Sequence, residues 1–429
     1  MPCILKEHTP TSPGIVTFTQ NEVLRGTLAK SSRARKFLLD SAQRESWLFG
    51  VHIQGFLGDA ATWPLEPWQS FVMWPNRSAP FLSSVPAAQQ LGLNCINFMP
   101  SVPQRLVGLE KNVDICVVSR PSAIKRIYET LLIIRELMNL RSDLTATIIV
   151  PDYRRVGAGD ACYQVHDLDR RFYELPRKLF SACELKQLSF LCSSEECFGR
   201  LPLANGLMTD LLHRSRFLLL TSHREGTPRV LAEALMTGVP CIVSKNLECG
   251  IIDSLNSGNC LFIDDETPAA ATQIHEALTN YQRYRVDADH FSKIFGADTN
   301  KWILQSWLSG QVASRGKAVE GRWFLDDLHL RLAGHGQKYN LQFMNRPKLF
   351  FRWFDCVSQA SEGASGQYDP YDEDRIFADG ELNDDQPSLS MKNVEYVKRV
   401  ITRGANVVRR KFVESGWVVP GGRRQDIKL

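Results

Sequence analysis

Residues 217–240 constrain the fold more than any other part of the sequence. They begin with a short apolar run, Phe217–Thr221, which is typical of a buried strand that ends at small polar residues. Thr227 and Pro228 then predict a helix start, with the Thr227 hydroxyl at the N-cap and the proline in the first helical position. Gly238 closes this helix before another strand-like run. The segment therefore predicts a strand, a tight loop, a helix and a second strand.

Two glutamates of this segment point to a ligand. Glu233 lies in the middle of an otherwise apolar helix, and a buried carboxylate is costly unless it finds hydrogen-bond donors. Glu225 lies earlier, in the loop at the carboxyl end of the strand. The backbone N–H groups of Gly226, Thr227 and Arg229 are expected to cluster at the helix start, where the dipole favours an anion. Carboxylates can accept hydrogen bonds from hydroxyl groups, and backbone amides can donate to a phosphate. A site that combines the two suits a sugar nucleotide.

These residues resemble a known family. The segment Glu225–Pro240, EGTPRVLAEALMTGVP, is similar to the E-x7-E signature of the retaining GT-B glycosyltransferases, the glycogen-synthase-like and mannosyltransferase-like group called family 4. The context supports the resemblance: a strand precedes it, glycine follows the first glutamate, and Glu-Ala-Leu is followed by Gly-Val-Pro. The resemblance implies that Glu233 holds the ribose hydroxyls of a nucleotide-sugar donor and that Glu225 lies against the donor sugar.

The region from 113 to 285 has the regular pattern of an α/β domain. Strand-like runs alternate with helical segments, which predicts a doubly wound parallel sheet. Ligands of such sheets bind beyond the carboxyl ends of the strands. The predicted strands are Val113–Ser119, Thr145–Val150, Leu188–Cys192, Phe217–Thr221, Cys241–Ser244 and Leu261–Ile263, and the predicted helices include Ser122–Leu140, Gly206–His213 and Pro268–Tyr281.

A second candidate site is the segment RPSAIK, from Arg120 to Lys125, which directly follows the first of these strands. Its position predicts that it lies at the same sheet edge as Glu225. In the resembled family a matching Arg and Lys hold the donor diphosphate. The resemblance therefore implies that Arg120 and Lys125, with the amides of Gly226 and Thr227, stabilise the departing diphosphate without a metal. The alternative interpretation is a solvated basic loop.

Residues 1–112 carry a weaker pattern. Trp47–Ile53 and Cys95–Met99 are predicted to be strands, and Ala79–Leu91 a short helix. The region is short for the N-terminal domain of a GT-B enzyme, so the resemblance predicts a reduced, acceptor-side α/β domain. His52 could match an acceptor-side histidine, but a lone histidine near a strand end is more often structural, and it is left out of the candidate site.

The C-terminal third divides into three kinds of segment. Residues 286–360 are predicted to form a helical extension in which the aromatic run 347–357 is a buried helix, with membrane-interface contact as the alternative. Residues 361–429 combine an acidic linker at 362–386, which is predicted to be disordered, with a basic segment at 394–412. The basic segment suits a solvated helix face, docking on the acidic linker or peripheral contact with anionic lipid.

Composition narrows the remaining possibilities. The formal net charge of +4 over 429 residues is too small to indicate nucleic acid as a partner. The 11 cysteines are scattered without paired metal-binding spacing, which is typical of buried free thiols in a reducing compartment. Neither a signal peptide nor an apolar run of transmembrane length is evident. We therefore expect a cytoplasmic protein, with peripheral membrane contact through the basic segment as the alternative.

These features predict an α/β protein of GT-B-like architecture, with domains at 1–112, 113–285, 286–360 and 361–429. The predicted function is transfer of a sugar from a UDP- or GDP-linked donor to a glycan or lipid-linked acceptor with retention of configuration. No cofactor or metal is expected, because the Asp-rich motif at 372–374 lies in the predicted linker. The alternative is a glycosyltransferase-like pseudoenzyme or subunit that binds nucleotide sugar or a partner without turnover. An NAD-dependent Rossmann enzyme is disfavoured, because no G-x-G-x-x-G follows a strand.

Overall fold

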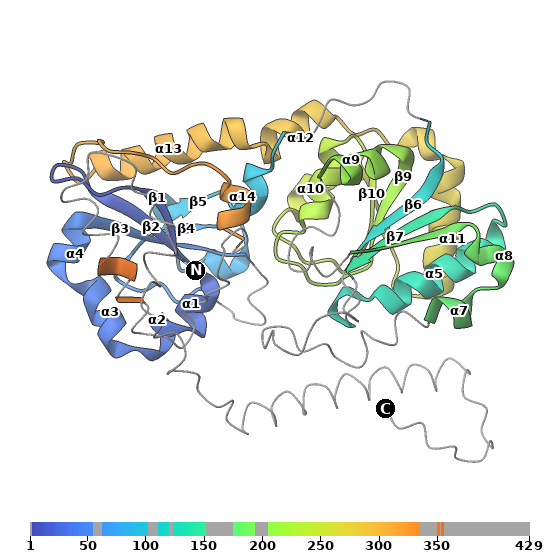
Figure 1. Ribbon diagram of the computed structural model, residues 1–429, viewed down its shortest axis with the longest axis horizontal. Coiled ribbons are helices and arrows are strands. Elements are labelled where there is room, and N and C mark those ends of the chain that lie inside the picture. The colour runs from blue at the N-terminus through green and yellow to red at the C-terminus, as the bar shows by residue number, and fades with distance from the viewer. Residues whose placement is uncertain are drawn as a thin grey trace, which may run out of the picture. The chain divides into compact units, whose positions relative to one another are not determined.

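Two β-sheets with their covering helices make up the described part of the chain (Figure 1). By its contacts the chain divides into residues 1–376 and residues 377–429, and the second unit lies outside the described residues. Both sheets belong to the first unit. The computed structural model describes residues 2–54, 62–101, 110–119, 123–151, 175–193, 205–333, 350–351 and 353–355.

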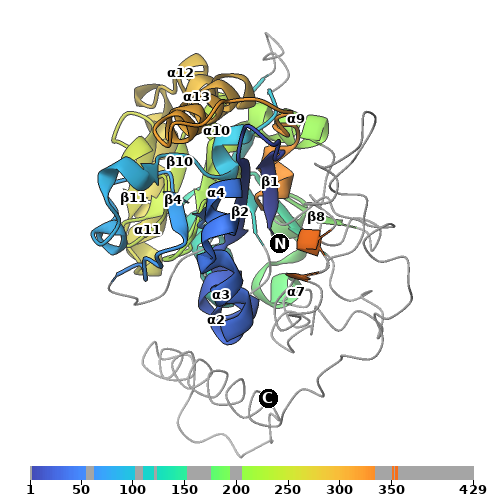
Figure 2. The ribbon, with the colours of Figure 1, turned by 90° about the vertical axis from the view of Figure 1, so that its left-hand side faces the viewer.

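The first sheet has five strands in the order β1-β2-β3-β4-β5. β1 runs antiparallel to β2, and the other neighbouring strands are parallel. Figure 2 shows the short helices α2, α3 and α4 beside this sheet. The strands are Cys3–Lys6, Gly14–Thr19, Trp47–His52, Gln69–Met73 and Gln90–Leu91; the helices α1 to α4 are Gln20–Leu24, Thr27–Lys30, Ser32–Leu39 and Ser41–Ser46; and the 3-10 helices η1 to η3 are Pro80–Leu82, Ala87–Gln89 and Cys95–Phe98.

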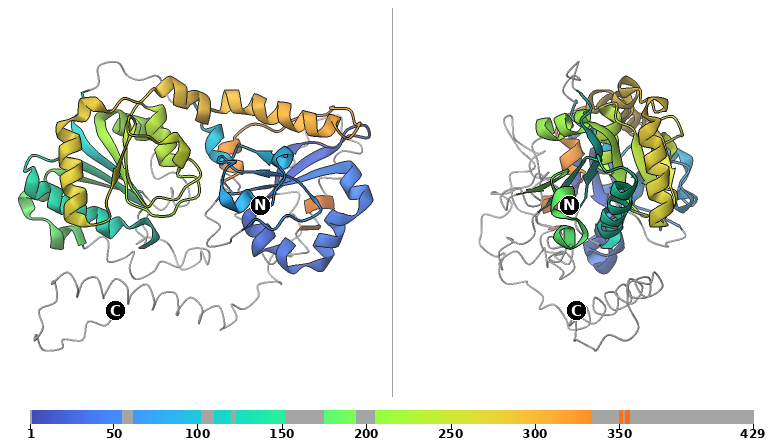
Figure 3. Two further views of the ribbon diagram at one scale, coloured as in Figure 1. Left: turned by 180° about the vertical axis from the view of Figure 1, so that it is seen from behind. Right: turned by 90° about the vertical axis from the view of Figure 1, so that its right-hand side faces the viewer.

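Helices from the C-terminal part of the chain cover this first sheet. Leu304 and Leu308 of α13 and Leu332 beyond α14 share one hydrophobic core with Leu48 and Phe71 of the sheet. Figure 3 shows α13 crossing the strands of this sheet. The helices of this region are α12 Ala288–Phe295, α13 Ala297–Ala313 and α14 Leu328–Arg331.

The aromatic segment near residue 350 also packs on the first sheet. Phe350, Trp353 and Phe354 are buried. The ring of Phe354 lies 4.7 Å from that of Phe37 and 5.3 Å from that of Trp47, measured between centroids. These three aromatic side chains are therefore buried as predicted, and not free for contact with a membrane interface. No helix among the described residues combines the length and apolarity needed to cross a membrane.

Some predictions for residues 1–112 were wrong. Cys95–Met99 was predicted to be a strand, but Cys95–Phe98 is a 3-10 helix that starts after the capping side chain of Asn94. Met99 then exchanges hydrogen bonds of 2.9 and 3.0 Å with the backbone of Phe295 and Ala297. Ala79–Leu91 is not a helix, because prolines divide it into two 3-10 turns and a short strand. The strands β1, β2 and β4 were not predicted.

The second sheet has six parallel strands in the order β11-β10-β9-β6-β7-β8. This is the doubly wound order of a Rossmann-like sheet, as predicted. The order reverses between β6 and β9, and ligands of such sheets bind at that switch point, beyond the carboxyl ends of the strands. The strands β6 to β11 are Val113–Val118, Ala146–Pro151, Leu188–Ser193, Ser215–Leu220, Cys241–Ser244 and Cys260–Ile263; the helices are α5 Ile127–Leu140, α7 Leu175–Leu179, α8 Ala182–Leu185, α9 Asn205–Arg214, α10 Arg229–Met236 and α11 Thr267–Thr279; and the 3-10 helices are η4 Ala123–Lys125, η7 Ile252–Ser254 and η8 Tyr281–Arg283.

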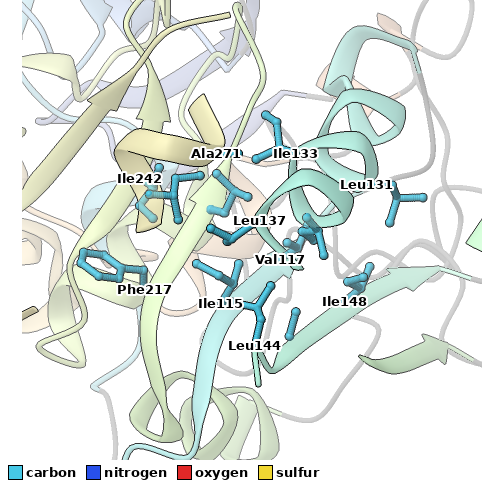
Figure 4. Packing of buried hydrophobic residues seen from close by; sticks show 14 of the residues in the cluster. Ile115, Val117, Leu131, Ile133, Leu137, Leu144, Ile148, Phe217, Ile242 and Ala271 are labelled. Atoms are coloured by element: carbon cyan, nitrogen blue, oxygen red, sulfur yellow. The ribbon is translucent and has the colours of Figure 1, made fainter. Parts of the chain in front are cut away.

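Helices α5 and α11 bury one face of this sheet. Figure 4 shows Leu131 and Leu137 of α5 packed with Ile115 and Val117 of β6 and with Ala271 of α11. Because the central strands are covered by helices, their sequences read as continuous apolar runs instead of alternating ones. The helix α10 packs in the other hydrophobic cluster of this sheet, through Leu231, Ala232, Ala234, Leu235 and Met236.

Candidate functional site

The loop that follows β9 is held by the loop that follows β10. Glu225 donates its backbone N–H to the carbonyl of Glu248 at 2.9 Å, and Glu248 donates to His223 at 2.7 Å. Gly250 donates to the carbonyl of Gly226 at 2.7 Å. These bonds continue the pairing of the two strands beyond the sheet, so the first glutamate of the signature lies on a fixed backbone.

Lys125 and Glu225 form an ion pair across the switch point of the sheet. Lys125 ends η4, which follows β6, and Glu225 follows the neighbouring strand β9. The carboxylate is buried, with 8% of the side chain exposed, and its second oxygen, Oε1, has no hydrogen-bond partner among the described residues. The buried hydroxyl of Ser222 is also without a partner there. Two predicted site residues, Lys125 and Glu225, therefore contact each other. The unbonded Oε1 of Glu225 can still accept a hydrogen bond from a ligand hydroxyl.

The helix α10 begins one residue later than predicted. Pro228 is the N-cap residue, with φ −69° and ψ 100°, and it carries no side-chain hydrogen bond to the helix. The expected capping by Thr227 was therefore wrong, and its hydroxyl instead lies 3.6 Å from the thiol of Cys95. The backbone N–H of Gly226 donates no hydrogen bond to another backbone group of the described residues. It precedes the helix start, where the sequence predicted an anion.

Glu233 lies on α10, about one helical turn after the first residue of the helix. Its side chain is 16% exposed, and one oxygen lies 3.8 Å from Nη2 of Arg229. Burial raises the pKa of Glu233, and the charge of Arg229 opposes this increase only in part. The nearest cation among the described residues lies beyond hydrogen-bond distance, so this carboxyl group keeps acceptor capacity for ligand hydroxyls.

A network around Asp265 was not predicted from the sequence. Arg126, the N-cap residue of α5, adopts the left-handed conformation, with φ 51° and ψ 35°, which is costly for a residue other than glycine. Its guanidinium donates to Asp265 at 2.7 Å and also contacts the ring of His223. Burial alone would raise the pKa of Asp265, but the hydrogen bonds outweigh it and hold that pKa well below its usual range. The donors to the two carboxylate oxygens are Arg126, His223, Ser244 and Asn246.

Asp265 therefore fixes the residue next to Lys125. Asp265 follows β11, and its bonds tie the start of α5 to the loops after β9 and β10. The only sequence signal for this arrangement was its location, because every partner lies at the carboxyl end of a strand or in the segment that follows one.

Replacement of Asp265 by Asn is expected to lower the free energy of unfolding by about 1–2 kcal/mol at pH 7, because charge-assisted hydrogen bonds are lost. A carboxyl group whose folded-state pKa is lowered stabilises the protein above its unfolded-state pKa, about 3.9. That contribution is lost as the pH falls toward the folded-state pKa. The difference between Asp265→Asn and the wild type should therefore be constant from about pH 7 to pH 5 and shrink from about pH 4 to pH 3.

Urea unfolding at each pH measures this difference. Asp143→Asn is the matched control, because Asp143 is paired with Arg141 at 3.0 Å but is 77% exposed, and such surface pairs contribute little. If the loss of unfolding free energy in Asp265→Asn stayed the same down to the lowest pH, the carboxylate charge would not be what stabilises the fold.

Some predicted site features lie outside the described residues. Arg120, the partner expected beside Lys125, is one of them, and the acidic and basic segments of 362–386 and 394–412 are others. In the part of the chain that the structure does describe, no three His, Cys, Asp or Glu side chains converge as metal ligands would. His52 is buried and hydrogen-bonds to Thr17 at 3.1 Å, and burial lowers its pKa to about 3. It is a structural residue of the first sheet.

Residues 197–290 match the sequence profile of the family described as "Glycosyl transferases group 1". The match includes the loop after β9, the helix α10 and the loop that carries Asp265. This part of the chain is therefore similar to a glycosyltransferase group 1 domain. No curated protein matches the chain.

Solved structures of glycosyltransferases are similar to part of the chain at low identity. The pneumococcal O-GlcNAc transferase GtfA, in complex with UDP and GlcNAc, is 14% identical over 67% of this chain and 55% of that chain, with a TM-score of 0.42. Anabaena HepE, in complex with UDP and glucose, is 16% identical over 64% of this chain and 76% of that chain, with a TM-score of 0.42. Sucrose-phosphate synthase from Thermosynechococcus elongatus is 15% identical over 62% and 68%, with a TM-score of 0.42. The chain spans about half the length of GtfA, 55%.

Proposed function

We propose that the protein is a retaining glycosyltransferase that takes its sugar from a nucleoside-diphosphate donor. The observation that carries this proposal is the Lys125–Glu225 ion pair at the switch point of the second sheet. Glu225 belongs to the segment that matches the glycosyltransferase group 1 profile. At one sheet edge, a cation can bind phosphate and a carboxylate can accept hydrogen bonds from hydroxyl groups. This combination suits a sugar nucleotide.

Each residue of the site has a role in this proposal. Glu233 accepts hydrogen bonds from the ribose hydroxyls, and the free Oε1 of Glu225 accepts one from the donor sugar. Lys125 binds the diphosphate, together with the backbone amides of Gly226 and Thr227 at the helix start. Arg120 is proposed to join Lys125, as the family resemblance implies.

Catalysis in this proposal depends mainly on the departing nucleoside diphosphate. Negative charge develops on the leaving phosphate as the bond to the sugar breaks, and preorganised cations and amides stabilise that charge. Lys125 and the helix-start amides supply this stabilisation with no metal. Glu225 holds the sugar through a hydroxyl, and its buried position strengthens that hydrogen bond. The acceptor is proposed to be a glycan or a lipid-linked glycan.

A transfer and hydrolysis assay tests the proposal. The full chain is incubated with a panel of UDP- and GDP-linked sugars, with glycan and lipid-linked acceptors, and product anomers are analysed by NMR. Transfer with retention is the expected result. Binding of nucleotide sugar without hydrolysis or transfer would instead support the non-catalytic alternative, and absence of binding throughout the panel would reject both.

A further inference from the structure

Three mostly buried cationic side chains belong to the proposed donor site among the described residues, and two of them have a close acidic partner. Lys125 is paired with Glu225, and Arg126 is bonded to Asp265 at 2.7 Å. The third cation is Arg229, the first residue of α10. Its surroundings differ from those of the other two.

The guanidinium of Arg229 has no such partner. Its side chain is 18% exposed, and Nη2 lies 3.8 Å from an oxygen of Glu233, which is beyond hydrogen-bond distance. Both Nε and Nη2 are buried and make no hydrogen bond to the described residues. A mostly buried guanidinium with unbonded N–H groups and only a distant counter-charge is costly, so a bound anion would stabilise it.

The position of Arg229 indicates which anion would complete the site. Arg229 and Glu233 are four residues apart on α10, so they lie on one face of this helix, and Glu225 lies in the loop just before it. In the proposed function Glu225 contacts the sugar and Glu233 contacts the ribose. The group that joins a sugar to a ribose in a nucleotide sugar is the diphosphate.

We propose that the Arg229 guanidinium binds the donor diphosphate and stabilises it as the leaving group. This inference rests on the proposed function and adds to it, because the family resemblance assigns the diphosphate to Arg120 and Lys125. A guanidinium suits this role because its planar donors can bind two phosphate oxygens at once. The free Nε and Nη2 are the two atoms that would form such a bidentate contact.

Binding measurements on Arg229 variants test the inference. The full chain and its Arg229→Gln variant are titrated with UDP and GDP by calorimetry, and with uridine and guanosine by ligand-detected NMR. We expect Arg229→Gln to weaken binding of the nucleoside diphosphate by about tenfold or more, and to leave nucleoside binding unchanged. Arg229→Lys should recover part of the lost affinity, because lysine restores the positive charge but not the planar pair of N–H donors.

Arg224→Gln is the matched control. Arg224 lies in the same loop, but it is 47% exposed and paired with Glu248 at 3.5 Å, so its loss should leave both affinities unchanged. Equal diphosphate affinity in the wild type and Arg229→Gln would overturn this inference but not the proposed function. Equal losses of diphosphate and nucleoside binding would also overturn it, because they indicate a structural role. A wild-type chain that binds neither diphosphate would instead reject the proposed function together with the inference.

Discussion

Glu225→Gln is expected to lower kcat/KM for sugar transfer by about 100- to 1000-fold, the range found when one preorganised group of a catalytic site is removed. The substitution keeps the shape of the side chain but removes the charge that is paired with Lys125. It also replaces one carboxylate oxygen with an NH2 group, which cannot accept a hydrogen bond from a sugar hydroxyl. Steady-state kinetics with the active donor, and a thermal unfolding midpoint for each protein, measure the effect.

Glu248→Gln is the control for this prediction. Glu248 lies in the neighbouring loop, its side chain is 57% exposed, and it pairs loosely with Arg224 at 3.5 Å. Its replacement should change kcat/KM by less than about twofold, because exposed ion pairs contribute little. If Glu225→Gln retained the activity of Glu248→Gln, the buried carboxylate would have no part in the reaction.

Phe217→Ala is expected to cost about 3–5 kcal/mol of unfolding free energy, because it leaves a large cavity in the core. Phe217 is fully buried on β9, and its ring lies 5.5 Å from that of Tyr281 and 5.0 Å from that of Tyr284, both edge to face. Loss of this ring removes its contacts with the two tyrosine rings, which support β9, the strand that precedes the Glu225 loop. Chemical denaturation measures the change.

Phe262→Ala tests whether burial causes this effect. Phe262 lies on β11 of the same sheet but is 37% exposed, so its truncation should cost about 1 kcal/mol or less. Similar losses for the two variants would contradict the packing described for the core of the second sheet.

Much of the second sheet could be predicted from the sequence. Its strands are buried on both faces, so they stand out as apolar runs, and the helices between them have regular apolar spacing. The start of α5 could not be placed in this way. The helix begins at Ile127 instead of Ser122, because Ala123–Lys125 form a 3-10 turn and Arg126 adopts a left-handed conformation. Sequence periodicity carries no signal for such a backbone.

The first sheet was harder to predict because polar residues lie in its strands. Lys6 ends β1 fully buried, and its ammonium donates to the carbonyls of Glu7 and Pro13 at 3.0 Å each. Burial lowers the pKa of Lys6 to about 8. Thr17 is buried on β2 against His52. A hydrophobicity pattern assigns such polar residues to the surface, although in the fold their polar groups are buried and hydrogen-bonded.

The candidate site was predictable only in part. Lys125 and Glu225 could be placed at one sheet edge from the sequence because each follows a strand, and the structure pairs them. The role of Glu233, which lies on α10, stays a prediction. The network around Asp265 joins segments far apart in sequence, so only the fold brings them together. The unbonded Nε and Nη2 of Arg229 likewise could be found only once the neighbouring residues were known.

Nucleotide binding through Glu233 tests the central claim most directly. The wild type and Glu233→Gln are titrated with the preferred nucleoside diphosphate and with its 2′,3′-dideoxy analogue. The account predicts that the wild type binds the analogue about tenfold more weakly, because the ribose hydroxyls lose their buried acceptor, and that Glu233→Gln binds both ligands with similar affinity. A wild type that binds both ligands equally, or a variant that discriminates as the wild type does, would contradict it.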